Sequence, residues 1–419
     1  MDDARPETPP TRESLERLDR ADPLGGIRDR FYLPAGVIYL DGNSLGALPK
    51  TAPVRVAQVV EEEWGRHLIG GWRRDGWMDY PERLGNKIAH LIGAGAGEVI
   101  TVDTTSVNLF KLIAAALTLR PTRKTVLSDT GNFPSDVYMA QGLIELLGAK
   151  HRLKLVEEDQ IEAAIDGDTA LVMVTHVNYK SGRVHDMAAI TRAAQAKGAL
   201  MLWDLCHSAG AVPVNLTRAG ADLAVGCGYK FLNGGPGAPA FLYVAQRHHD
   251  RTRQPLTGWL GHADPFAFDL AYRPAPGILH YKCSTPPIVA LAALECGVDI
   301  MLEAGMDRLR QKSMALGDLF IRLMDTRLAD RGFRPACPRN AEARGSQVSF
   351  HHDAGYAIMQ ALIERGVVGD FRAPDIMRFG LTPAYTRHVD IWNAVEILAR
   401  IMDTKAYDRP EWREPSGVT

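Results

Sequence analysis

The chain has 419 residues, of which 46% are hydrophobic and 23% are charged, and its formal net charge is −2. This length exceeds what a single hydrophobic core usually holds, so we expect one large domain and a smaller one. The near balance of acidic and basic residues gives no electrostatic reason to expect nucleic acid or a membrane surface as a partner.

The five cysteines form no CxxC pair and are too few for a disulfide framework in a chain of this length. The polar, proline-containing N-terminus has no apolar stretch of the kind found in signal peptides, and no later segment offers about 18 uninterrupted apolar residues. We therefore expect reduced thiols and a cytoplasmic protein. The histidine pairs 248–249 and 351–352 lack the spacing of metal ligands, so no metal site is expected.

From about residue 99, short β-rich runs alternate with segments of helical length. The expected strands cover residues 99–102, 125–127, 171–174, 200–203, 223–225 and 240–244, and the intervening helices include 109–119, 137–147 and 187–196. This alternation predicts an α/β domain with a mainly parallel sheet covered by helices.

After Pro286 and Pro287, a run rich in Ala, Leu and Met extends to about residue 325 and predicts one or two helices. These lead into a smaller α+β domain with strand candidates at 347–350 and 376–379 and a closing helix at 389–402. We accordingly expect three parts. An N-terminal segment, residues 1–50, contributes to the small domain and to the site. It is followed by a large domain, residues 51–290, and a small C-terminal domain, residues 291–419.

Polar residues follow several expected strands, at the edge where open α/β sheets bind their ligands. The hydroxyl-rich stretch 103–108 opens a helix and offers N–H groups and a positive dipole end to a phosphate, although these residues could simply cap the helix. Asp204 ends a buried strand, and His207 follows it. A buried carboxylate is costly unless it meets a cation, such as a protonated pyridine nitrogen; a loop cap and a core histidine are the structural alternatives.

Lys230 lies between two β-rich runs, is flanked by Tyr229 and Phe231, and precedes a glycine-rich turn. A partly desolvated lysine can act as a nucleophile or form a Schiff base. Together with the aromatic loop 132–136, these pieces supply a phosphate cradle, a ring for stacking, a partner for a ring nitrogen and an amine for an aldehyde. This set meets the needs of pyridoxal 5'-phosphate (PLP).

The order and spacing of these residues resemble those of fold-type-I PLP enzymes, and five strings resemble the kynureninase family in particular. The strings are DGNSLG at 41–46, NFPSD at 132–136, DLCHSAG at 204–210, GYKFLNGGPG at 228–237 and MRFGLTP at 377–383. The resemblance spans residues from about 40 to 385, and the Tyr-Lys pair followed by Asn-Gly-Gly-Pro-Gly is its most specific part. It implies a PLP-dependent hydrolase that cleaves the Cβ–Cγ bond of L-kynurenine, with 3-hydroxykynurenine as a further candidate substrate. The products would be anthranilate, or 3-hydroxyanthranilate, and L-alanine, in the kynurenine pathway of tryptophan catabolism or in NAD biosynthesis.

Carried over by position, the resemblance also implies roles for individual residues. The implied catalytic residues are Lys230, Tyr229 and Asp204. The implied cofactor contacts are Thr105, Ser106, Phe133, Asp136, Thr175, Asp204, His207, Tyr229, Lys230, Trp259 and Thr285. In this family Trp259 and Thr285 would reach the phosphate from the neighbouring subunit, so the resemblance implies a homodimer with the site at the subunit interface. Thr285 stands where animal members carry asparagine, which leaves the choice between kynurenine and its 3-hydroxy form open.

Arg378 lies inside the apolar run 376–379, where burial would be costly without an anion, and its planar fork suits a carboxylate. From the residues alone, an outward-facing strand position is an equal alternative. With the resemblance, Arg378 is assigned to the α-carboxylate of the substrate. Asn43 and Ser44 are expected near the same substrate, and Trp72 is expected to pack on its aromatic ring.

Two other interpretations stay open. A cysteine desulfurase or aminotransferase of the same fold would share this layout, but a desulfurase needs a mobile nucleophilic cysteine, for which Cys337 is the nearest candidate. A catalytically silent binding protein could keep the fold and the cofactor. The presence of Lys230, Tyr229 and Arg378 argues against a silent protein.

Overall fold

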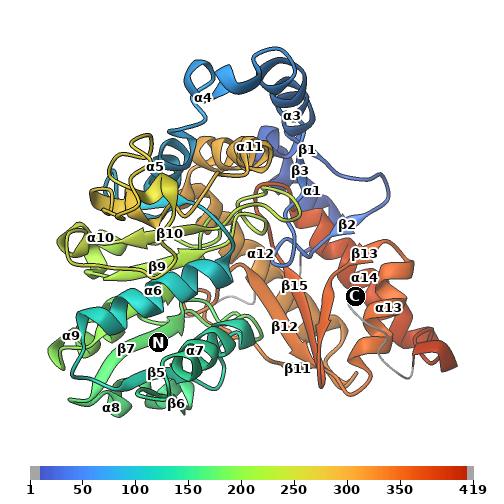
Figure 1. The fold of residues 1–419 in the computed structure, drawn as a ribbon. Helices are drawn as coiled ribbons and strands as arrows, with labels where there is room; N and C mark the ends of the chain where they lie inside the picture. Colours follow the sequence, from blue (N-terminus) through green and yellow to red (C-terminus); the bar gives the residue numbers. More distant parts are fainter. Residues whose placement is uncertain (1–9, 413–419) are drawn as a thin grey trace.

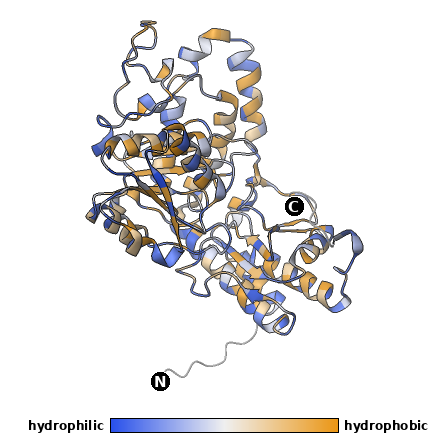
Figure 2. Cartoon of the chain, turned by 60° about the horizontal axis from the view of Figure 1, so that its bottom comes forward, coloured by the Kyte–Doolittle hydropathy of each residue, from blue (hydrophilic) through white to orange (hydrophobic). Residues whose placement is uncertain are grey.

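The structure is a computed structural model that describes residues 10–412. A large domain built on a seven-stranded sheet and a smaller domain built on a four-stranded sheet lie side by side (Figure 1). The helical ribbons alternate between hydrophobic and hydrophilic segments, as expected for helices that bury one face (Figure 2). None of the helices within residues 10–412 has the length and apolarity required to cross a membrane.

The N-terminal segment connects the two domains. It contains α1 (Arg12–Arg20), α2 (Gly25–Arg28), β1 (Phe31–Tyr32), β2 (Ile38–Tyr39) and β3 (Leu48–Pro49). β1 pairs with β3, whereas β2 pairs with β13 (Val367–Val368) of the small domain. The chain then enters a projecting arm, the blue helices at the top of Figure 1, made of α3 (Ala52–Gln58), η1 (Val59–Trp64), η2 (Leu68–Gly70) and α4 (Gly71–Arg74).

The large sheet has the strand order β4-β10-β9-β8-β7-β5-β6. Its strands are β4 (Val99–Thr101), β5 (Thr125–Asp129), β6 (Arg152–Val156), β7 (Thr169–Thr175), β8 (Leu200–Asp204), β9 (Leu223–Gly226) and β10 (Phe241–Val244). The neighbours from β9 through β6 are parallel, while β10 is antiparallel to both β4 and β9. This confirms the expected mainly parallel sheet and all six expected strands. β6 is not among the predicted strands, because this edge strand has a polar sequence, RLKLV, and none of its residues is fully buried.

Helices cover both faces of this sheet. Along β8, Leu200 and Leu202 pack with α6 (Thr105–Leu119) and α7 (Pro134–Leu146), whereas Met201 and Trp203 face the opposite side. That second side is covered by α5 (Tyr80–Ile92), α8 (Ile161–Ala164), α9 (Met187–Ala196), α10 (Leu216–Ala219) and α11 (Ile288–Ala304). The short 3-10 turns of this domain are η3 (Glu158–Gln160), η4 (Gln246–His248), η5 (Trp259–Gly261) and η6 (Gly277–Tyr281).

The expected helical run after Pro287 is two helices, α11 and α12 (Met306–Arg327), separated by Gly305 at φ 77°. Glycine adopts this positive φ without strain, which allows the chain to change direction between the domains. α11 packs with α3 and α5 in the large core, while α12 packs with α14 (His388–Thr404) in the small one. We therefore propose that the domain boundary lies near Gly305.

The small domain carries an antiparallel sheet in the order β11-β12-β15-β14. Its strands are β11 (Arg334–Pro335), β12 (Gln347–His351), β14 (Asp370–Arg372) and β15 (Ile376–Gly380), and its further helices are α13 (Gly355–Glu364) and η7 (Pro410–Trp412). Both expected strands and the closing helix are present. The end of β15 bridges to Asp41 of the N-terminal segment, so this sheet meets that segment beside the large domain.

Candidate active site

A cavity lies at the carboxyl ends of the large sheet. It is lined by residues that follow β4, β5, β7, β8 and β9, as expected for an open α/β sheet. The structure brings nine of the predicted cofactor residues together in its wall: Thr105, Ser106, Phe133, Asp136, Thr175, Asp204, His207, Tyr229 and Lys230.

The amine of Lys230 is enclosed by other side chains of this cavity. Lys230 is 9% exposed, and its Nζ lies 3.0 Å from His207 Nε2. The same nitrogen lies 5.7 Å from the ring centroids of both Phe133 and Tyr229. Lys230 is therefore a single amine directed into an aromatic-walled cavity.

Two carboxylates lie in the wall of the same cavity. Asp204 ends β8, is 2% exposed, and its Oδ1 accepts a 2.7 Å hydrogen bond from the N–H of Cys206. Asp136 lies in the first turn of α7, is 1% exposed, and its Oδ2 has no hydrogen-bond partner within the described residues. Burial raises the pKa of both groups, and repulsion from Asp204 raises the pKa of Asp136 further. This pair requires a proton or a cationic donor to be stable.

The helix that begins beside the cavity is capped by a residue outside the predicted set. Thr104 is the N-cap of α6, and its hydroxyl accepts a 3.3 Å hydrogen bond from the N–H of Val107. The hydroxyls of Thr105 and Ser106 are therefore not needed for capping, and both residues line the cavity. Hydroxyl donors at a positive helix end form a suitable site for a phosphate.

These features fit PLP. A buried carboxylate pair suits a protonated pyridine nitrogen, and Lys230 offers an amine for the aldehyde. Phe133 is 39% exposed although it belongs to the cavity wall, so part of its ring is free to stack on a planar ligand. The loop that carries Phe133 is held in place because Asn132 Nδ2 donates to Ser128 Oγ at 2.9 Å and Asn132 Oδ1 accepts from the hydroxyl of Thr175.

A second cluster lies next to the cavity, where the N-terminal segment meets β15. Arg378 is buried there, so the outward-facing alternative is wrong; its Nε donates to Asp370 Oδ1 at 2.6 Å. Its Nη1 donates at 2.5 Å to the carbonyl of Tyr179, a residue of the cavity wall, and its Nη2 donates to Ser44 Oγ at 3.2 Å. Asn43 is also buried, and both polar atoms of its amide lack partners within the described residues. Predicted substrate residues and the cofactor cavity are thus adjacent.

Three further predicted residues belong neither to the cavity wall nor to the Arg378 cluster beside it. Trp259 is 39% exposed and Thr285 is also exposed, both on the segment between β10 and α11. Trp72 lies on α4 of the projecting arm, where its ring meets that of Trp77 edge-on at 5.7 Å. This single chain therefore does not bring these three residues into the wall of the cavity.

The structure also adds wall residues that were not singled out: Leu109, Ser135, Tyr179 and Cys206. Ser135 and Cys206 lie within the strings that carry the resemblance. Tyr179 follows β7 in a loop, and an aromatic residue after an expected strand is the signal that could have identified it.

Comparison with known proteins agrees with this geometry. The family model of the kynureninase C-terminal domain matches residues 309–398, and that of the DegT/DnrJ/EryC1/StrS aminotransferase family matches residues 79–222. The kynureninase of Burkholderia pseudomallei (strain K96243) is 51% identical over 414 residues, which cover 98% of this chain and 100% of the relative. The kynureninase of Pseudomonas fluorescens shows the same identity and coverage.

Solved structures of PLP enzymes share the fold. The cysteine desulfurase of Thermococcus onnurineus NA1 matches with a TM-score of 0.77 at 20% identity, covering 91% of this chain and 98% of that chain. A C-DES mutant with glycine covalently linked to its PLP cofactor matches with a TM-score of 0.73 at 17% identity, covering 93% and 99%. At these identities the likeness shows the fold alone, which is that of fold-type-I PLP enzymes.

Two observations argue against the cysteine desulfurase alternative. The desulfurase structures share far less sequence with this chain than the kynureninases do. Cys337, the candidate nucleophile, is buried between β11 and β12, and burial raises the pKa of its thiol. A buried thiol with a raised pKa is a poor nucleophile. With half of its residues identical to curated relatives over nearly the full length, the chain belongs to the kynureninase family.

Proposed function

We propose that the chain uses PLP to hydrolyse the Cβ–Cγ bond of L-kynurenine, with 3-hydroxykynurenine as a further candidate substrate. One water is consumed, and the products are anthranilate and L-alanine. The observation that carries the proposal is the enclosed Lys230 amine in one cavity with two buried carboxylates, Asp204 and the partly unpartnered Asp136, in a chain 51% identical to curated kynureninases.

PLP supplies an aldehyde that binds amines covalently and a protonated ring that withdraws electrons from the substrate carbons. Thr105 and Ser106 would hold its phosphate, Phe133 would stack on its ring, and Asp204 would keep its ring nitrogen protonated. Lys230 Nζ would hold the aldehyde in the resting enzyme. Once an amino acid has taken that place, the freed amine would move the proton of the substrate α-carbon, a role that suits an amine enclosed within the cavity.

Tyr229 would act as a proton donor in the later steps. Burial raises the pKa of its phenol, so the hydroxyl keeps its proton at neutral pH. A protonated hydroxyl beside Lys230 can donate to the β-carbon after the C–C bond breaks, which completes the methyl group of L-alanine.

Arg378 would bind the substrate α-carboxylate, supported by Ser44, and Asn43 would present its unpartnered amide to the substrate. The carbonyl of Tyr179 orients the guanidinium next to the cavity. A charged donor in a buried site fixes the orientation of an amino acid as well as its affinity.

Turnover provides the test. The PLP-loaded protein is mixed with L-kynurenine, and anthranilate fluorescence and L-alanine release are followed together. We expect equal rates of formation of the two products, loss of both in Lys230→Ala, and wild-type rates in Lys197→Ala, which removes an exposed lysine at the end of α9. A PLP-loaded wild type that forms neither product would overturn the proposal.

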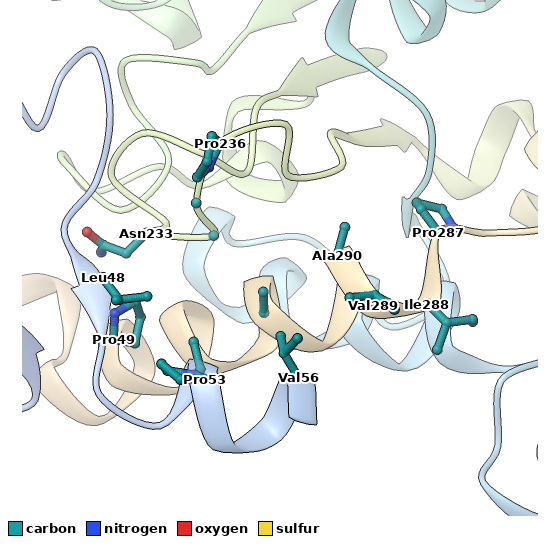
Figure 3. A pocket seen from close by; sticks show the side chains of 14 residues that line it. Leu48, Pro49, Pro53, Val56, Asn233, Pro236, Pro287, Ile288, Val289 and Ala290 are labelled. Carbon is teal, nitrogen blue, oxygen red and sulfur yellow. The ribbon is translucent and has the colours of Figure 1, made fainter. Parts of the chain in front are cut away.

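We further propose a homodimer with the site at the subunit interface. An apolar groove runs between the start of α11, the glycine-rich turn after Lys230 and the β3–α3 segment, with Leu48, Pro53, Val56, Pro236 and Val289 among its walls (Figure 3). On the segment that leads to α11, Phe268 and Leu270 are also exposed. Exposed apolar surface is typical of subunit interfaces, and the exposed Trp259 and Thr285 lie on the same β10–α11 segment as Phe268 and Leu270.

Mixing two inactive variants tests the shared site. We expect Lys230→Ala and Trp259→Ala each to be inactive alone. If Trp259 serves the partner's site, random exchange of subunits would restore about one quarter of wild-type activity, because half of the dimers are hybrids with one intact site. No recovery after mixing would contradict a shared site.

The five free cysteines are consistent with the cytoplasmic location that we propose for this enzyme.

A further inference from the structure

Four charged side chains form a cluster at the proposed carboxylate site, and Arg378 is one of them. Arg378 on β15 and Arg372 on β14 both pair with Asp370: Arg378 Nε donates to Oδ1 at 2.6 Å, and Arg372 Nη2 lies 2.8 Å from Oδ2. The fourth member is Asp41, which follows β2 and forms a backbone bridge with Gly380 at the end of β15. The proposed reaction assigns no role to Asp41.

Asp41 differs from Asp370 in its partners. Asp41 is 9% exposed, its Oδ1 has no hydrogen-bond partner, and no ion pair joins it to either arginine within residues 10–412. Burial and repulsion from Asp370 raise the pKa of Asp41 to about 7. For Asp370 burial acts in the same direction, but the hydrogen bonds from Arg378 prevail and lower its pKa. The two carboxyls of the cluster are therefore not equivalent.

The other titratable groups around Asp41 keep their protonation near neutral pH. Tyr39 on β2 and Tyr385 after β15 face it, and burial raises the pKa of both phenols. His207, on the cavity side of the arginines, has its pKa lowered well below the usual value by burial and by the charge of Lys230. Asp41 is thus the group here whose proton can be exchanged under ordinary assay conditions.

The charges of this cluster indicate what changes when an amino-acid substrate binds. Before substrate binds, the cluster holds two guanidinium groups and two carboxyl groups. The α-carboxylate of the substrate would add a third negative charge to this buried site. Uncompensated charge of this kind is costly, and a like charge favours the protonated form of a neighbouring carboxyl. We propose that Asp41 takes up one proton from solvent when the substrate carboxylate binds at Arg378, and releases it when L-alanine leaves. This inference rests on the proposed function, because it takes Arg378 as the carboxylate site.

The pH dependence of KM for L-kynurenine tests the coupling. In the wild type, binding requires protonation of Asp41, so KM should rise up to about tenfold per pH unit above neutrality. Asp41→Asn presents a neutral group of the same shape at every pH, so the ratio of wild-type to variant KM should grow between pH 6 and 8. Asp29→Asn removes the same charge from an exposed position of the N-terminal segment and should follow the wild type.

Two measurements on the PLP-loaded enzyme do not depend on turnover. Titration calorimetry with L-alanine at pH 8, in buffers of different ionisation enthalpy, should show up to about one more proton taken up by the wild type than by Asp41→Asn. Infrared difference spectra of the wild type should gain a protonated carboxyl band when L-alanine is added, which keeps the test valid if the variant fails to fold.

Parallel KM profiles of the wild type and Asp41→Asn, equal proton uptake, or no new carboxyl band would each overturn the inference. Failure of the proposed function has a different signature, because the wild type would then not convert L-kynurenine at any pH. Both ideas are therefore tested separately by one set of proteins.

Discussion

Gly46 is the point at which the N-terminal segment touches the loop of the proposed catalytic lysine. Its N–H donates to the carbonyl of Tyr229 at 2.8 Å. A β-carbon at this position would lie 2.3 Å from the carbonyl oxygen of Lys230 and 2.5 Å from Asn233 Oδ1. Since ordinary contact begins near 3.4 Å, Gly46→Ala must push the two backbones apart by roughly 1 Å, the difference between 3.4 and 2.3 Å.

A displacement of this size acts on Lys230 and, through the same turn, on Asn43 and Ser44. Misplacement by about 1 Å can reduce a rate by ~10²-fold, and overpacking a tight contact costs about 1–3 kcal/mol of stability. We expect Gly46→Ala to lower kcat/KM for L-kynurenine by about two orders of magnitude and to lower the unfolding temperature modestly. The matched control is Gly26→Ala, because no atom lies within 4 Å of its β-carbon position. Wild-type kcat/KM in Gly46→Ala would refute the close contact between the two segments.

Two further predictions concern stability and cofactor affinity. Lys111 is fully buried and donates to Asp103 Oδ2 at 2.5 Å and to the carbonyl of Tyr281 at 2.6 Å, so Lys111→Met should cost about 1–3 kcal/mol in urea unfolding. Lys111→Met should also weaken PLP binding, because Asp103 immediately precedes the N-terminus of the helix at the proposed phosphate site. Unchanged stability and unchanged PLP affinity would contradict this prediction. Burial lowers the pKa of several histidines: His176 to about 3, His185 and His280 to about 4, and His207 well below its usual value. The unfolded chain binds protons near pH 6.5 that the folded chain does not, so the free energy of unfolding should fall on acidification, by up to about 1.4 kcal/mol per histidine per pH unit. His280→Gln, away from the cavity, should flatten this dependence between pH 6.5 and 5.5, and an identical slope would contradict the assignment.

Much of the fold follows from sequence patterns because buried strands and amphipathic helices differ in period. The central strands are fully buried and appear as continuous apolar runs, as in β7 and β8. β6 lies at the sheet edge with basic residues at two of its five positions, so it lacks this signal. The break at Gly305 depends on the positive φ that joins two consecutive helices, and composition alone does not locate such a turn.

For the site, local motifs were more informative than long-range pairings. Lys230, Asp204 and Thr105 each follow a strand of one sheet, so sequence order alone places them at a common edge. The pairing of Arg378 with Asp370 arises from the register of β14 against β15, and the position of Asp41 depends on a bridge to Gly380. Neither contact has a local sequence signature. Roles for Trp259 and Thr285 require a second subunit, and one chain leaves them on the surface.

Lys230 is the residue to which we assign the covalent attachment of the cofactor. Borohydride reduction of the PLP-loaded protein fixes the cofactor on its lysine, and peptide mass spectrometry then identifies the modified residue. We predict one modified position, Lys230, with no labelling of Lys111, a fully buried lysine near the phosphate-binding turn. Modification of a different lysine, or retention of full labelling in Lys230→Ala, would contradict it.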